Sequence, residues 1–338
     1  MNHDQVAAAD PAAFDWETRL RAAFAVPGLA GLVVGARDLW DQCPRNRPRA
    51  VPSSGGTAAP SSRPGDPGRR GHGGDGGAAT GPDLVLTTAE FALLWADLGL
   101  GPMPYPLAVP ACGRTPALRA EFTAEVYREL GTRGLAAGGR LAADLEALLV
   151  LLAGCEFAVD AVAHVGYPLR ALAGTDRHTA VLAMLAGGEV WLTAIRPTAL
   201  ASAIAGVLPA RDAGPGHGLS LPRAVLTAAA EPAEDVFGAR MEPKAVLRAG
   251  GVSPVDTAVL LELAAGRRTG GQFAVSRTGP GRARRMDTLV SWFDTSRGRY
   301  LLVREDSWLS LAPASAIRLE HRLAALLSEV DELNHAWC

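Results

Sequence analysis

The sequence is poor in cysteine, and its one candidate leader is too short to cross a bilayer. Four cysteines among 338 residues, with no CxxC spacing, match neither a zinc site nor a disulfide framework. We therefore predict reduced thiols in a cytoplasmic protein. The apolar stretch near the amino terminus falls short of the roughly 20 residues that a membrane helix needs. No membrane insertion is expected. The cysteines are Cys43, Cys112, Cys155 and Cys338.

The sequence also lacks a strong charge of one sign. Lys and Arg number 33 against 35 Asp and Glu, which gives a net charge of -2, so no overall basic field draws the chain to nucleic acid. Aromatic residues make up only 6%, which leaves few stacking surfaces for a single strand. With 48% hydrophobic residues, the chain can nevertheless bury a sizeable core.

Sequence signals of catalysis are equally scarce. There is no GxSxG motif, and Ser291 falls within a predicted strand rather than on a strand-to-helix turn. Asp294 and Arg299 flank a predicted turn, where we expect them to lock a hairpin rather than to catalyse. The four histidines of the core have no paired spacing, whereas metal sites need clustered ligands, so we expect them to face solvent. We predict no enzyme, metal or cofactor. These histidines are His164, His178, His217 and His321.

What the sequence does contain is the same order of predicted helices and strands in two successive segments. Residues 145–208 and residues 259–327 each read as a helix, four short alternating strands and a helix. Both copies enter the last helix through a proline, Pro197 or Pro313. A repeated order indicates two pseudo-symmetric halves that share one sheet, which is typical of a binding platform. The strands are expected at residues 156–165, 169–174, 178–185, 189–195, 271–277, 286–295, 298–304 and 307–312.

The chain ahead of the repeat falls into an extension and a linker. Residues 1–40 form an extension whose acidic start and Pro27 argue against a signal peptide, which leaves a short amphipathic helix or translated sequence upstream of the domain. Residues 41–82 are rich in Pro, Gly and Ser and are expected to be disordered. We expect residues before Asp83 to be dispensable for folding.

Order is expected to begin at Asp83. The core spans residues 83–330, in halves 83–210 and 211–330, and residues 331–338 form a tail. Thr87 or Thr88 is expected to cap the first core helix. Further helices are expected from Thr115 and over residues 135–152, 220–229, 243–250 and 254–266.

Three blocks of the core resemble the EspG family. They are LTTAEFALLWADLGLGPMPYPLAVP, RGLAAGGRLAADLEALLVLLA, and VSWFDTSRGRYLLV followed by WLSLAPASAIRLEHRLAALL. The resemblance implies an α+β fold, a quasi-twofold duplicated unit whose central antiparallel sheet is flanked by helical bundles. It also implies a cytosolic chaperone of a type VII (ESX) secretion system in an actinomycete. Such a chaperone binds the helical tip of a PPE-like or PE/PPE-type substrate, keeps it soluble and directs it to export.

The second-copy strands carry apolar residues on both faces, so they are either covered on both sides or open to a partner. We predict a partly open face anchored by Trp292, because helix recognition concentrates its energy in a few desolvated aromatics. The arginine-rich loop from Thr278 to Met286 is expected to border that face or to be a solvated loop tip. The predicted partner-binding residues are Gln272, Ala274, Ser276, Val290, Trp292, Leu301 and Val303, which should line one sheet face, and Arg282, Arg284 and Arg285, which should border it. An alternative is a nucleic-acid or nucleotide-binding regulator that uses the same arginines.

Overall fold

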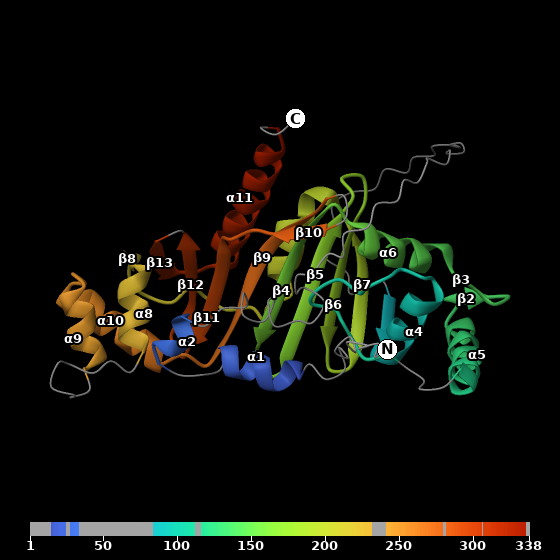
Figure 1. Cartoon of the computed structure of the whole chain (residues 1–338), viewed down its shortest axis with the longest axis horizontal. Coiled ribbons are helices and arrows are strands. Elements are labelled where there is room, and N and C mark those ends of the chain that lie inside the picture. Colours follow the sequence, from blue (N-terminus) through green and yellow to red (C-terminus); the bar gives the residue numbers. More distant parts are fainter. Residues whose placement is uncertain are drawn as a thin grey trace, which may run out of the picture.

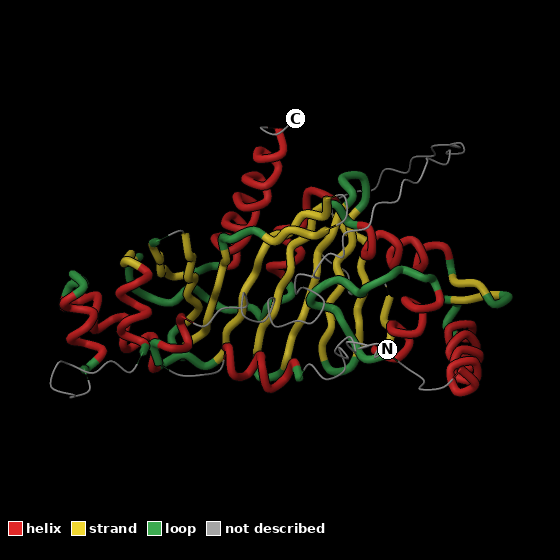
Figure 2. The backbone as a smooth tube through the Cα atoms, viewed as in Figure 1, coloured by secondary structure: helices red, strands yellow, loops and turns green. Residues whose placement is uncertain are grey.

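A single large antiparallel sheet with helices on both faces forms the core of the molecule (Figures 1 and 2). In the sheet, ten strands follow the order β1-β7-β6-β5-β4-β9-β11-β12-β13-β8, and β10 pairs with β9 beside this path. The predicted α+β class with a central antiparallel sheet is therefore found. The computed structural model describes residues 15–24, 28–33, 84–111, 116–231, 241–279, 282–305 and 307–335.

The strands confirm the predicted order within a few residues. β4 and β9 meet in the middle of the sheet, and β1 and β8 form its two outer edges. One half contains β1 (Leu84–Thr87), β4 (Phe157–His164), β5 (Pro168–Thr175), β6 (Ala180–Ala186) and β7 (Glu189–Ile195). The other contains β8 (Leu219–Pro222), β9 (Thr269–Gly279), β10 (Arg282–Arg285), β11 (Leu289–Thr295), β12 (Gly298–Glu305) and β13 (Trp308–Pro313).

The helices begin where capping residues allow. α4 (Thr88–Asp97) starts with a capping box, in which Thr87 Oγ1 accepts from the Glu90 amide at 3.1 Å and the Glu90 carboxylate accepts from the Thr87 amide at 2.7 Å. The predicted cap at Thr87 is therefore confirmed. The others are α1 (Trp16–Phe24), α2 (Ala30–Val33), α5 (Pro116–Thr132), α6 (Ala143–Gly154), the 3-10 turn η2 (Pro197–Ala199), α7 (Leu200–Gly206), α8 (Arg223–Ala230), α9 (Pro243–Ala249), α10 (Pro254–Ala265) and α11 (Ala316–His335).

Two predicted helices begin later than the sequence indicated. In residues 135–152 a small hairpin, β2 (Ala136–Ala137) with β3 (Arg140–Leu141), precedes α6, because Gly138 and Gly139 take φ values of 58° and 75°. Two successive left-handed residues make a tight hairpin turn rather than a helix. In residues 220–229 the first residues pair with β13 as β8. The last helix runs on to His335, into the predicted tail.

Helices of the chain cover both faces of the sheet. On one, which we call the α11 face, α7 and α11 pack on the strands through side chains that include Ile204 and Leu323. On the other, the bundle face, α4, α5 and α6 cover one end. The helices α8, α9 and α10, with α2, cover the other end. Between these bundles α1 packs against β4, β5 and β9, and Figure 1 shows it in blue along the lower ends of the central strands.

The hairpin between β11 and β12 is locked by an ion pair. Asp294 and Arg299 lie opposite one another, and Arg299 Nε and Nη2 donate to the two carboxylate oxygens at 2.8 and 3.1 Å. The Arg299 guanidinium also lies 4.5 Å from the centre of the Trp292 ring. The predicted structural role of this pair is confirmed.

Candidate protein-binding face

The residues predicted to line one sheet face lie on two. Val290 pairs with Phe273 and Trp292 pairs with Gly271, and paired residues point to the same side of a sheet. Gln272, Ala274 and Ser276 therefore point to the bundle face, while Val290, Trp292, Leu301 and Val303 point to the α11 face. The prediction was wrong here because a shift of one residue in register moves every side chain to the other face, and register is not visible in separate strands.

The tryptophan expected to anchor a partner is a core residue. Trp292 is 1% exposed and packs in the cluster that α7 and α11 cover. Val290, Leu301 and Val303 belong to the same buried cluster. The expectation of an open face at Trp292 is thus wrong, since the chain's own helices cover it. A role of these residues in binding a partner stays a prediction, but none is accessible in the free chain.

The arginine-rich segment forms strand β10 rather than a loop, and Arg285 points into the protein. Its Nε and Nη2 lie 3.1 and 2.5 Å from the carboxylate oxygens of Asp160, and these side chains are 5% and 1% exposed. Burial raises the pKa of Asp160, and the charge of Arg285 opposes that shift. In the free chain Arg285 is therefore not exposed to a partner or to nucleic acid, whereas both sequence-based hypotheses expected an exposed arginine. The side chains of Arg282 and Arg284 lie outside the described residues.

A small set of polar and apolar side chains occupies the middle of the bundle face, which we call the central face. It consists of Asp160, Val162, Arg170, Gln272 and Ala274, brought together because Val162 pairs with both Arg170 and Gln272 and Asp160 pairs with Ala274. All five are buried. Arg170 Nη1 donates to the carbonyl oxygens of Pro106 and Ala108 at 3.0 and 2.8 Å, which fixes the neighbouring segment.

The helix α1 covers part of this central face. Trp16, Leu20 and Phe24 recur every fourth residue, so they form one side of the helix, and they pack in a cluster with Tyr105 and Val162. Full burial of such side chains is worth about 1.5–3 kcal/mol each. The predicted short helix in the extension is therefore found, and it is packed on the core. Its dispensability for folding stays a prediction.

Cationic side chains hold both ends of α1. The Arg170 guanidinium lies 4.8 Å from the Trp16 ring centre, and the Trp16 and Tyr105 rings are 5.7 Å apart. At the other end, Arg267 Nη2 donates to the carbonyl oxygen of Ala23 at 3.2 Å, in the last turn, where carbonyls lack partners within the helix. Burial lowers the pKa of Arg267 to about 10, so the side chain remains charged at neutral pH.

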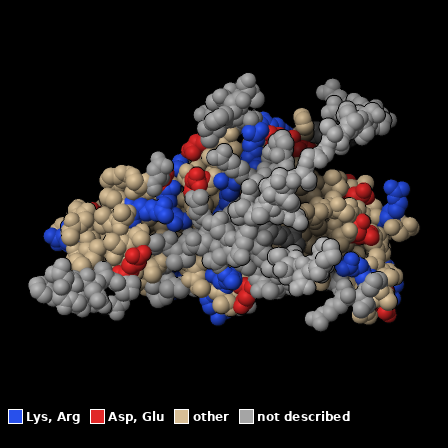
Figure 3. Space-filling view, in the orientation of Figure 1, with Lys and Arg blue, Asp and Glu red and all other residues tan. Residues whose placement is uncertain are grey.

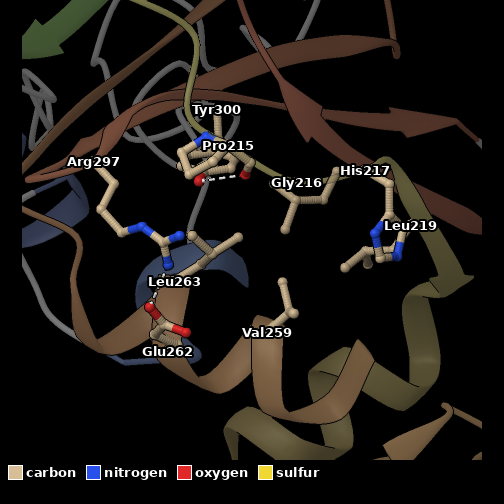
Figure 4. A pocket seen from close by; sticks show the side chains of 10 residues that line it. Pro215, Gly216, His217, Leu219, Val259, Glu262, Leu263, Arg297 and Tyr300 are labelled. Carbon is tan, nitrogen blue, oxygen red and sulfur yellow. Dashed lines mark hydrogen bonds and ion pairs between the residues drawn. The ribbon is translucent and has the colours of Figure 1, made fainter. Parts of the chain in front are cut away.

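A second candidate site is the pocket beside α10, shown in Figure 4, which is lined by His217. His217 belongs to a small polar cluster. His217 Nε2 lies 3.1 Å from Asp256 Oδ1, and Ser253 Oγ donates to Asp256 Oδ2 at 2.7 Å. Nucleophilic catalysis needs the histidine between serine and carboxylate, whereas here the carboxylate lies in the middle. Ser253 also caps α10 by accepting from the Asp256 amide. This cluster is therefore structural.

Other signals of chemistry are weak. Within the described segments, no three His, Cys, Asp or Glu side chains gather as metal ligands would. No helix described here is long and apolar enough to span a bilayer. Basic and acidic side chains both occur on the face seen in Figure 3. His164, expected to face solvent, is 7% exposed because β4 is a central strand covered on both faces.

Comparisons with known proteins agree with this fold. A sequence profile of the EspG family matches residues 87–325. Among solved structures, the chain is similar to the Mycobacterium tuberculosis type VII secretion system chaperone EspG5, solved in complex with a PE25-PPE41 dimer. That match has a TM-score of 0.58 at 15% identity and covers 72% of this chain and 95% of that one. A search of curated proteins finds no match. The helices α1 and α2 precede the residues that the profile matches.

Proposed function

This chain belongs to the EspG family, and from that premise we propose that it is a cytoplasmic chaperone of a type VII (ESX) secretion system. It binds the helical tip of a PPE-like substrate, either alone or as a PE/PPE-type dimer, keeps it soluble and directs it to export. The likeness of fold to EspG5, which was solved with such a dimer, supports this proposal. The function needs no catalytic step, metal or cofactor.

The substrate helix binds on the central face in this proposal. The observation that carries it is α1, because a surface that already packs an amphipathic helix has the shape and chemistry to receive one. Three residues of the predicted set, Gln272, Ala274 and Ser276, point to this side of the sheet and remain proposed contacts. Arg285 lies on the same side of the sheet as Ser276 and is held there by its pair with Asp160.

We also propose the predicted domain organisation. Residues 83–330 form one EspG domain with quasi-twofold halves 83–210 and 211–330, preceded by the extension 1–40 and the linker 41–82. The strand order supports the duplication, because β4 to β7 and then β1 on one side of the centre are matched by β9, β11 to β13 and then β8 on the other. The linker lies outside the described residues.

Co-expression with candidate substrates tests the function. The full chain should retain a PPE-like partner through affinity purification and gel filtration. Ser276→Glu, a half-buried position on the bundle face, should weaken retention about tenfold, the effect of one interface contact worth about 1.4 kcal/mol. Ser310→Glu, an exposed serine on β13, is the matched control and should leave retention unchanged. The proposed function fails if no PPE-like partner is retained by the unaltered chain.

A further inference from the structure

We propose that α1 is an internal occupant of the substrate site, which a substrate helix must displace before it binds. This inference rests on the proposed function, and it concerns a segment that the family profile does not match. The profile begins at residue 87, whereas α1 ends at Phe24. The central face is thus covered in part by a helix from outside the matched residues, while α7 and α11, on the opposite face, begin within them.

The contacts of α1 define what a competing helix must present. Aromatic, leucine and aromatic side chains at positions i, i+4 and i+8 fill the places of Trp16, Leu20 and Phe24. Arg267 provides a cap for the helix carboxyl end through the carbonyl that it now binds. Arg170 provides a cation for the first aromatic ring. The partner is therefore an amphipathic helix with this pattern, its carboxyl end directed at Arg267.

The way α1 is attached favours exchange. The Gly28 amide donates to the Ala264 carbonyl at 2.9 Å, and Leu29 and Leu32 join the cluster under α8. These contacts keep α1 near the central face. Docking of α1 is therefore intramolecular and needs less affinity than the binding of a separate helix. A site that is filled for most of the time lowers the apparent affinity for a competitor by the fraction of time it is open. Substrate binding is therefore weaker in the intact chain than the site itself permits.

A substitution that undocks α1 tests the inference in the full chain. Leu20 is fully buried on the central face, whereas Ala22 is on the exposed side of the same helix. We compare Leu20→Asp with the matched control Ala22→Asp. The first probe is a labelled synthetic peptide of residues 15–33, measured by fluorescence anisotropy. The second probe is the substrate that the unaltered chain retains in co-expression, and its retention by each variant is compared.

Leu20→Asp should bind the peptide at least tenfold more tightly than the unaltered chain, and Ala22→Asp should not. The same tenfold gain is expected for the substrate. Equal peptide binding by all three proteins, or unfolding of Leu20→Asp, would overturn the inference, since α1 would then be either no occupant or part of the core. Substrate affinity that is unchanged by Leu20→Asp would also overturn the inference. If the peptide gains affinity but no chain retains any substrate, the proposed function fails while the helix-binding face stands.

Discussion

The two faces at the centre of the sheet are closed in different ways. On the α11 face, Trp292 and its neighbours are covered by α7 and α11, which begin inside the residues that match the EspG profile. On the central face, Val162 is covered by α1, which precedes them. The first is a hydrophobic cluster bordered by the Asp294 and Arg299 pair, which stays within the β11–β12 hairpin, while the second holds an ion pair and two further arginines around a helix.

This difference supports the central face as the proposed binding site. The α7 and α11 side of the sheet gains its free energy mainly from close apolar packing, and opening it exposes apolar surface without compensation. A face with fixed cations and hydrogen-bond donors can exchange one helix for another, because its polar groups find equivalent partners in both states. The central face is therefore the better candidate for binding, although the sequence directed attention to Trp292.

The largest expected effect is on the α11 face. Trp292→Ala should lower the free energy of unfolding by about 4 kcal/mol, the usual loss for truncating a buried tryptophan. Urea unfolding followed by circular dichroism measures this. Trp308→Ala is the matched control, because Trp308 is 53% exposed and should change stability by no more than about 0.5 kcal/mol. Equal effects of the two substitutions would mean that Trp292 is not core.

The next effect concerns the Asp160–Arg285 ion pair of the central face. Asp160→Asn leaves the charge of Arg285 buried without its counter-ion and should cost about 3 kcal/mol. The double substitution Asp160→Leu with Arg285→Met should recover most of that loss, since it removes both charges. Glu262→Gln, which breaks the exposed pair with Arg297, should cost less than about 0.5 kcal/mol. If the Asp160 and Glu262 substitutions cost the same, the Asp160 pair is open to solvent.

A smaller effect is expected when α1 itself is weakened. Leu20→Ala should lower the free energy of unfolding by about 2 kcal/mol, a loss limited because α1 can leave without unfolding the sheet. Leu323→Ala, an equally buried leucine of α11, should cost about 3 kcal/mol. The same denaturation series measures both. A loss at Leu20 as large as that at Leu323 would contradict separate docking of α1.

The smallest effect is expected at Cys155, which packs in the cluster that α4, α5 and α6 cover. Burial raises the pKa of its thiol from 9.0 to about 11, so it should resist alkylation at pH 8 even in Leu20→Asp. Because the folded pKa is the higher one, its contribution to stability is complete below pH 9 and is lost as the pH rises toward 11. Mass spectrometry of the alkylated protein locates the label. Rapid labelling of Cys155 in Leu20→Asp would show that the bundle opens together with α1.

Much of the fold could be predicted because its signals are local. Strand alternation located the strands around Val159 and Phe273, and the proline and cap positions located the helix starts. The resemblance of three blocks to the EspG family was confirmed, because the family profile matches residues 87–325, which include all but the outermost residues of those blocks. The Asp294 and Arg299 lock was predictable because both residues flank one turn.

The candidate site could not be predicted because it depends on contacts between distant segments. Trp16 meets Tyr105 and Arg170 across a long sequence separation, and nothing in the extension alone shows where it packs. The pairing of Asp160 with Arg285 crosses the two halves. The sequence predicted a loop over residues 278–286 and missed β10, because the glycines and proline at the turn dominate the local pattern.

Hydrogen exchange of the full chain with and without bound substrate is the most direct test of α1 as an occupant of the substrate site. We predict that amides of Trp16–Phe24 are protected in the free chain and lose that protection when substrate is bound, while those of α11 do not change. A complex in which Trp16–Phe24 stays as protected as before would contradict the displacement of α1.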